Sequence, residues 1–252
     1  MNISKKWQIK KSFQRVYKGK NMVISIGNLP LKEIKADVFL HPVKYKDSIT
    51  YEPMAEEAVI ALIAKHFTYD KVPEKVKEYF DEMDDGYLFS ESNFDEFDLE
   101  KLDVGTILAG RDLSLHPKTE NIRKFLALLR DFGGFEIKGI EVPEFFTPSD
   151  PELAEIVETE KSYEIALEEI DELESFDGSV VYACDDPIVV KNNELLCSHQ
   201  FIIANKIKSL KVKVDGEIKE IKKIPELKGT FGVILKPVDE YPFLRVKIQN
   251  VN

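Results

Sequence analysis

The sequence predicts an α/β protein in which a Rossmann-like, partly parallel sheet with flanking helices is followed by a small C-terminal antiparallel β unit. In the first two thirds of the chain, short apolar segments alternate with helical patterns. This alternation is typical of proteins in which helices connect parallel strands. After residue 206, short alternating strands separated by turn residues take over. We therefore expect a basic N-terminal arm at 1–20, an α/β domain at 21–206 and a β unit at 207–252.

The α/β domain is predicted to begin with a strand at 22–28, which alternates apolar with small or polar residues before the turn signal Gly27-Asn28. Residues 38–40 predict a second, short strand. From Glu52 to His66, apolar residues recur every three or four positions, which predicts a helix that begins near Pro53 and buries one face.

The clearest α/β signal lies in the middle of the chain. An apolar strand is predicted from Val104 to Gly110, a helix from Thr119 to Asp131 and another strand from Phe135 to Val142. The short connections favour a right-handed crossover between parallel strands.

Two acidic blocks surround this unit. Residues 78–103 hold eleven acids and one base, and their six aromatic residues favour a loop and short helix packed on the core over disorder. Residues 150–177 hold twelve acids and one lysine, which predicts one or two surface helices. Short strands are then expected at 179–183 and 188–190.

The C-terminal unit is predicted from a hairpin at 211–221, whose two alternating strands enclose the turn Asp215-Gly216. Strands at 230–235 and 243–248 complete it, with Pro237 and Pro242 restricted to loops or sheet edges.

Composition excludes several classes of protein. The net charge of −11 argues against a nucleic-acid partner, because an acidic surface repels phosphates. We expect no membrane span and no secretory signal, hence a cytoplasmic protein. Two cysteines, Cys184 and Cys197, are too few for a disulfide framework, so reduced structural thiols are expected.

The basic arm departs from this acidic balance. Residues 1–20 carry seven basic and no acidic residues, interleaved with Trp7, Phe13 and Tyr17. An arm of this kind suits an acidic, partly apolar groove of a partner protein. The residues we expect to bind that partner are Lys5, Lys6, Trp7, Lys10, Lys11 and Arg15.

A ligand edge is predicted at Arg111, Asp112, Asp185 and Asp186, because open α/β sheets bind ligands at the carboxyl ends of their strands. No phosphate loop accompanies it: residues 105–110 read Gly-Thr-Ile-Leu-Ala-Gly, and Arg111-Asp112 follows where Lys-Ser/Thr is needed. Because the ligand edge itself is present, a flavin- or nucleotide-binding protein is kept as an alternative. A hydrolase that holds magnesium on Asp185 and Asp186 is another.

Cys197-Ser198-His199 contains residue types that bind metals or act as nucleophiles, but no complete ligand set or catalytic group accompanies them. The paired cysteine spacing of structural zinc is absent, and the apolar flanks indicate a buried strand-to-helix passage in which Ser198 or Asn193 caps the helix. We expect no metal and no cofactor.

The stretch from Val104 to Ile137, with His116-Pro117-Lys118-x-x-Asn121, Leu128-Leu129 and Phe135-Glu136-Ile137, resembles a molybdopterin-oxidoreductase-like segment of the large iron–sulfur subunit of bacterial complex I (NADH-quinone oxidoreductase). The likeness is to the Campylobacter and Helicobacter group, and residues 86–93 are similar too. The cluster cysteines and the glycine-rich flavin and NADH loop of that family have no counterpart here.

The resemblance implies a peripheral-arm subunit of the respiratory chain that takes part in electron transport without a complete active site. Its partners would be the other subunits of a membrane-associated redox complex, together with an electron carrier such as flavodoxin or ferredoxin. The chain would then be a cytoplasmic docking subunit, held at the inner membrane through its partners.

Overall fold

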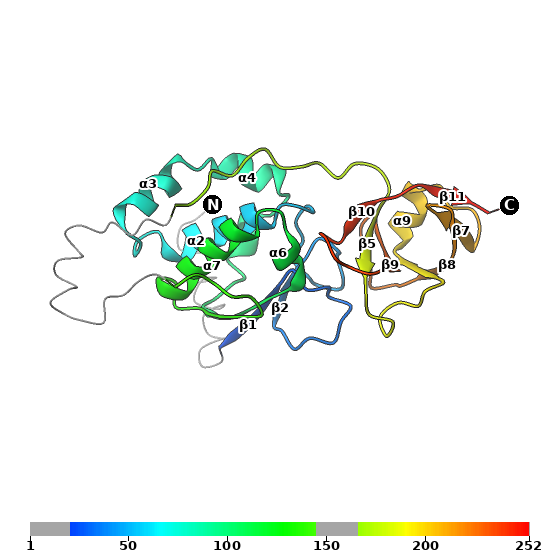
Figure 1. Cartoon of the computed structure of the whole chain (residues 1–252), viewed down its shortest axis with the longest axis horizontal. Helices are drawn as coiled ribbons and strands as arrows, with labels where there is room; N and C mark the ends of the chain where they lie inside the picture. Colours follow the sequence, from blue (N-terminus) through cyan, green and yellow to red (C-terminus); the bar gives the residue numbers. More distant parts are fainter. Residues whose placement is uncertain (1–20, 145–165, 252) are drawn as a thin grey trace, which may run out of the picture.

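Two sheets, each with its own helices, organise the chain. The computed structural model describes residues 21–144 and 166–251, and they form two lobes lying side by side (Figure 1). The first lobe contains β1 (Met22–Ile26), β2 (Val38–Leu40), β3 (Gly105–Ala109) and β4 (Glu136–Lys138). All three strand pairs are parallel, in the order β2-β1-β3-β4, so the predicted α/β fold is confirmed.

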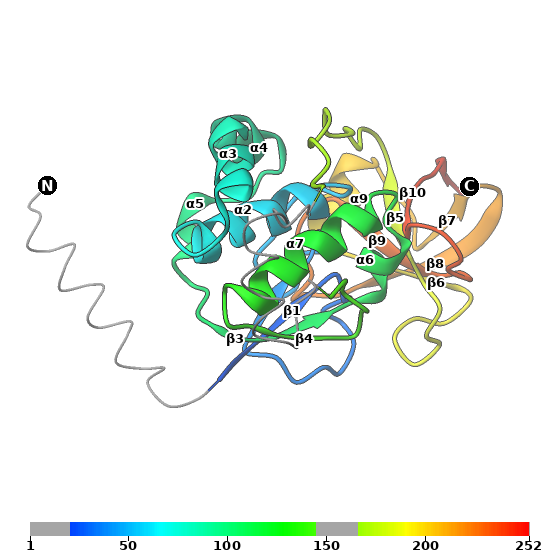
Figure 2. The same ribbon diagram turned by 60° about the vertical axis from the view of Figure 1, so that its left-hand side comes forward.

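Helices α2 (Glu56–Thr68) and α7 (Thr119–Asp131) pack on the sheet and on each other (Figure 2). Their apolar residues join those of the strands in one core, in which Ile24, Ile107 and Phe125 are fully buried. Parallel strands are usually connected by a helix, and helices lie in the connections from β2 to β3 and from β3 to β4, whereas residues 27–37 connect β1 to its parallel neighbour β2 without one. Helix α7 covers the predicted residues, and α2 begins a turn later than expected.

The first acidic block is more helical than expected. Instead of a loop and one short helix, it forms α3 (Glu74–Glu82), α4 (Asp85–Glu91) and α5 (Glu96–Leu99). Asp84 and Asp95 accept hydrogen bonds from backbone N–H groups at the starts of α4 and α5. Acidic residues thus cap the helices, while Phe80, Leu88 and Phe94 are buried in the core.

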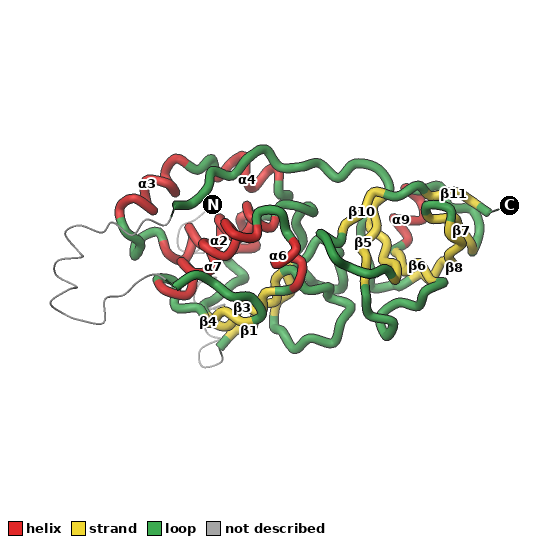
Figure 3. Tube along the Cα trace, viewed as in Figure 1, coloured by secondary structure: helices red, strands yellow, loops and turns green. Residues whose placement is uncertain are grey.

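The second lobe is a mostly antiparallel sheet in the order β10-β5-β9-β6-β8-β7-β11 (Figure 3). Its strands are β5 (Val180–Cys184), β6 (Glu194–Cys197), β7 (Lys211–Val214), β8 (Glu217–Lys223), β9 (Phe231–Leu235), β10 (Phe243–Arg245) and β11 (Ile248–Asn250). The pairs β5–β9 and β6–β8 are parallel. Helix α9 (His199–Ala204) packs Phe201 against one face.

This lobe is larger than the unit predicted at 207–252. Strand β5 pairs with β9 and β10, so the sheet already begins at Val180 and a boundary at residue 206 would cut through it. Residues 180–197 look like part of the preceding α/β pattern locally, because strand pairing is set by partners far away in sequence. The strand expected at 188–190 is a turn, because Asp186 accepts backbone hydrogen bonds from Val189 and Val190.

Residues 166–178, which we call the strap, run from the first lobe to the second along one side of the molecule (Figure 1). The strap belongs to the second acidic block, residues 150–177, in which one or two surface helices were expected. Residues 166–177 form no helix, and residues 150–165 lie outside the described residues. The buried Asn121 side chain donates to the carbonyl oxygen of Glu168 (3.0 Å) and accepts from its N–H (2.9 Å). At the other end, Phe176 lies against Tyr241 and Phe243.

Strand β3 meets the loop after β1 closely. A Cβ atom added to Gly110 would lie 1.8 Å from the carbonyl oxygen of Gly27, and the Gly110 N–H donates to Ile26 (2.7 Å). Only glycine fits here, because no flexible side chain could move aside.

We therefore expect Gly110→Ala to lower the free energy of unfolding by several kcal/mol, at or above the ~1–3 kcal/mol typical of overpacking. Gly86→Ala is the control: this glycine lies in helix α4 with its nearest neighbour 3.5 Å away, and the change should stabilise by ~0.5–1 kcal/mol. Urea unfolding of both variants measures the difference. Equal effects would show that the Gly27–Gly110 approach is not tight.

Candidate functional site

Three of the four residues of the predicted ligand edge meet where the lobes join. Arg111 and Asp112 follow β3 at the start of helix α6 (Arg111–Leu115), and Asp185 follows β5 of the second lobe. Arg111 forms an ion pair with Asp185 and donates to the carbonyl oxygen of Val238. Lys32 lies 3.6 Å from the other Asp185 oxygen. The edge is thus bridged by contacts between the lobes.

Asp112 is buried and bonded on both sides. One of its carboxylate oxygens lies 3.0 Å from Nε2 of His41, and the other accepts from the Tyr182 hydroxyl at 2.9 Å. His41 follows β2, and its Nδ1 accepts from the Val43 N–H at 2.9 Å. Because Nδ1 is an acceptor, the ring proton resides on Nε2 and is donated to Asp112. Burial, reinforced by Asp112, raises the pKa of Tyr182 far above its usual range.

Asp186 does not join this group. Its side chain accepts from the Ile188 N–H at 2.9 Å and shapes its own turn. The Asp185 and Asp186 carboxylates therefore serve different contacts, and the arrangement gives no support to the magnesium-dependent hydrolase. The residues of the predicted partner-binding arm, from Lys5 to Arg15, lie outside the described residues.

A second buried polar group lies beside the first. The Tyr241 hydroxyl, next to β10, donates to Oε1 of Glu56 at 2.8 Å and accepts from the Met54 N–H at 2.7 Å. His116 lies 3.2 Å from the Met54 carbonyl oxygen and 3.5 Å from Oε2 of Glu56. Its Nδ1 accepts from the Lys118 N–H, so this ring too carries its proton on Nε2.

Two atoms of this region lack hydrogen-bond partners among the described residues: Oε2 of Glu56 and the Tyr51 hydroxyl, both fully enclosed. Burial raises the pKa of Glu56 to about 8 and lowers that of His116 to about 4. At neutral pH, Glu56 is therefore a protonated acid and His116 a neutral base. Neutral forms are favoured because a buried charge loses its hydration.

These residue types could carry acid–base catalysis, but their arrangement does not offer it. His41, Glu56, Asp112 and His116 are each at most 3% exposed. Both ring nitrogens of each histidine face a partner, so no lone pair is presented to a substrate. We interpret the two groups as a polar joint between the lobes.

Sequence reasoning missed His41, Glu56, His116, Tyr182 and Tyr241. One signal was present: His41 directly follows β2 and Asp112 follows β3, two parallel strands whose carboxyl ends share an edge. The tyrosines come from the second lobe, and no pattern in the chain indicates that they reach this edge.

The cysteines are both buried free thiols, as expected. Burial raises the pKa of Cys197 to about 11, and it also raises that of Cys184. Protonated thiols are poor nucleophiles. Ser198 caps helix α9 by accepting from the Phe201 N–H at 3.0 Å, as predicted.

Within residues 21–144 and 166–251, no three His, Cys, Asp or Glu side chains gather where they could hold a metal ion. None of the helices described there combines the length and apolar character that crossing a membrane requires.

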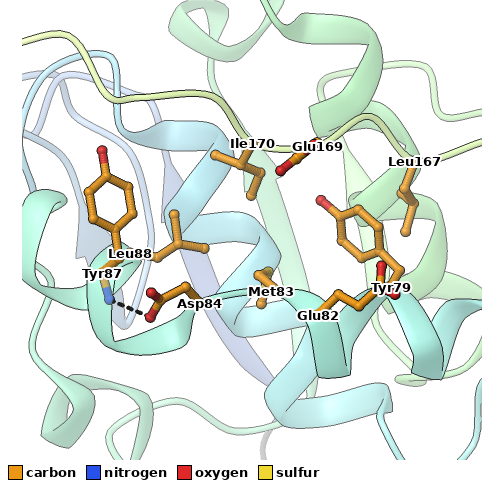
Figure 4. Close-up of a pocket in the computed structure, with 9 residues that line it drawn as sticks. All are labelled: Tyr79, Glu82, Met83, Asp84, Tyr87, Leu88, Leu167, Glu169 and Ile170. Carbon is orange, nitrogen blue, oxygen red and sulfur yellow. Dashed lines mark hydrogen bonds between the residues drawn. The ribbon is translucent and has the colours of Figure 1, made fainter.

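Two open pockets lie away from the joint. One, of about 620 Å³, is formed beside β2 by residues 30–34, 36–39, 45–49 and Lys101, with lysines and acids in equal number. The other, of about 440 Å³, lies between α3, α4 and the strap (Figure 4).

No protein-family model matches the chain, and neither a curated protein nor a solved structure matches it. The resemblance of residues 104–137 to complex I stays a prediction.

We expect Tyr182→Phe to destabilise the protein by ~1–3 kcal/mol, because it leaves the buried Asp112 carboxylate one donor short. Tyr69→Phe removes the same kind of bond, to Asp81, at an exposed site and should destabilise the protein much less, because water replaces the lost partner. Chemical denaturation of both variants is the measurement. A loss as small for Tyr182 as for Tyr69 would contradict the role of Asp112.

We also expect stability to fall as pH rises from about 6.5 to 8. The pKa of Glu56 is about 8 in the folded protein and 4.5 in the unfolded chain, so the folded form keeps its proton at pH values where the unfolded form has lost it. The stability that this difference contributes is lost as pH rises from 4.5 to 8. The pKa of His116 is about 4 in the folded protein against 6.5 in the unfolded chain, so its contribution to stability increases as pH rises from 4 to 6.5. This increase cancels the loss due to Glu56 below pH 6.5. Above 6.5 the loss is about 1.4 kcal/mol per pH unit.

Glu56→Gln should remove this loss, whereas Glu78→Gln, at an exposed position of α3, should retain it. Thermal unfolding between pH 6 and 8.5 measures both variants. If the Glu56→Gln protein keeps the wild-type slope, Glu56 is not the titrating group.

Proposed function

We propose that this chain is a docking subunit of a larger assembly, without a complete active site of its own at the edge where an α/β sheet binds ligands. One observation carries this proposal: Arg111 and Asp112, the residues that should face a ligand there, are bonded to the second lobe instead. A nucleotide or flavin at this edge would have to displace Tyr182 and break the bonds of a buried carboxylate, at a cost of several kcal/mol.

The distribution of charge supports a docking role. Residues 74–103 contain twelve acids and three bases, and the strap contains six acids and no base. The second lobe, at 179–251, contains twelve bases and nine acids. A molecule whose first lobe and strap are acidic and whose second lobe is slightly basic is oriented toward partners by its charge, which also accelerates association.

The assembly we propose is a respiratory quinone oxidoreductase of the complex I type. This step rests on the resemblance of residues 86–93 and 104–137, which include parts or all of α4, β3, α6, α7 and β4. In such an assembly the chain would help to position a protein electron donor, such as flavodoxin or ferredoxin, near the membrane-attached subunits.

The first test is the activity of the purified chain. We expect no flavin absorbance and no NADH oxidation, because hydride transfer needs a bound flavin or a nicotinamide pocket. NADH-dependent reduction of an artificial acceptor at ~1 per second or faster would contradict the docking role.

The second test uses the reconstituted oxidoreductase. Leaving this chain out should abolish reduction by the protein donor and spare the chemistry on the quinone side. A complex that accepts electrons equally well without the chain would refute the respiratory assignment while leaving a docking role elsewhere open.

A further inference from the structure

The pocket beneath the strap has an apolar floor and an acidic rim. We call it the strap pocket; it encloses about 440 Å³ and is lined by Tyr79, Glu82, Met83, Asp84, Tyr87, Leu88, Leu167, Glu169 and Ile170. Figure 4 shows the side chains of α3 and α4 on one side and those of the strap on the other. Leu88 is buried, whereas Glu82, Asp84 and Glu169 are exposed.

The rim carries uncompensated negative charge. None of its three carboxylates forms a salt bridge with another described residue; Asp84 accepts only the Tyr87 N–H that caps α4. Three lysines that contact α4 or the strap already have partners: Lys65 pairs with Asp85, Lys118 with Asp171 and Lys124 with Glu168. A cation entering the pocket would therefore meet free carboxylates.

Two tyrosines hold the walls in place. The Tyr79 hydroxyl donates to the carbonyl oxygen of Glu168 at 2.8 Å, and the Tyr87 hydroxyl accepts from the Leu173 N–H at 3.4 Å. Aromatic rings beside carboxylates and an apolar floor suit lysine or arginine, whose aliphatic stem packs while its charged head contacts the rim. They also suit an adjacent aromatic side chain.

We propose that the strap pocket binds the basic arm, residues 1–20, of the same chain. The arm carries seven bases, no acids and three aromatic residues, which complements the rim and the floor together. Residues 145–165, the other segment outside the description, contain six acids and one lysine and do not match in charge.

The arm has sufficient length for this contact. An extended chain spans about 3.3–3.6 Å per residue, so the segment from Lys11 to the start of β1 covers roughly 35 Å. A lobe of this size has a radius of gyration of about 14 Å. Tethering also gives the arm a local concentration in the millimolar range, which favours its own pocket over that of a second molecule.

This proposal does not depend on which assembly the chain joins. In the absence of a partner the arm occupies the strap pocket, and the partner binding predicted for Lys5, Lys6, Trp7, Lys10, Lys11 and Arg15 then proceeds by exchange. An acidic groove on the partner competes with an acidic pocket on the chain.

Trp7 allows a direct test because it is the single tryptophan of the chain. We expect acrylamide to quench its fluorescence at least about twofold less effectively in dilute buffer than in 1 M salt, where the Debye length is only ~3 Å. Reversing two rim charges, Glu82→Lys with Glu169→Lys, should expose Trp7 even in dilute buffer.

The control is Glu226→Lys with Glu240→Lys, which changes the net charge equally at exposed positions of the second lobe and should leave Trp7 protected. Circular dichroism checks that both variants fold. Three results would overturn the proposal: equal quenching at both salt concentrations, protection that survives in the rim variant, or protection that grows with protein concentration, which would indicate docking on a second copy.

Discussion

The buried carboxylate of Asp112 is the constraint on which the two-lobed structure depends. A carboxyl group enclosed in protein is tolerated only when hydrogen-bonding partners replace the water it has lost, and here the partners come from two places. His41 belongs to the first lobe, whereas Tyr182 belongs to the second. The first lobe alone would leave Asp112 short of a donor. Glu56, the second buried carboxyl group, is protonated at neutral pH and accepts a hydrogen bond from the Tyr241 hydroxyl of the second lobe.

The joint also explains how an α/β sheet can lack an open ligand crevice. The carboxyl ends of β1, β2 and β3 point toward the second lobe, and His41 lies against the rings of Tyr182 and Phe243. The space in which related architectures hold a ligand is occupied by aromatic side chains. The open pockets are displaced to the outer edge of β2 and to the strap, away from the sheet's usual binding position.

Much of the fold was predictable, because helix α7, strands β1 and β3 and the β7–β8 hairpin each carry a local pattern. The extent of the second sheet was not, since β5 is defined by pairing with β9 and β10, some 50 residues further along the chain. Of the predicted ligand edge, Arg111, Asp112 and Asp185 do converge. Their use as a joint could not be foreseen, because it depends on Tyr182 and Val238, whose positions follow only from the packing of the lobes.

The pairing order of the second sheet has a consequence for synthesis on the ribosome. Strand β5 is made before both of its neighbours, so it lacks β9 until about residue 235 and β10 until about residue 245 has been made. Translation proceeds at ~5–20 residues per second, which leaves β5 with unpaired edges for several seconds after it leaves the ribosome. The hydrogen bond from Tyr182 to Asp112 is delayed as well, because Tyr182 lies on β5. During this interval β5 would present two open strand edges, and the first lobe would lack the Tyr182 donor to Asp112.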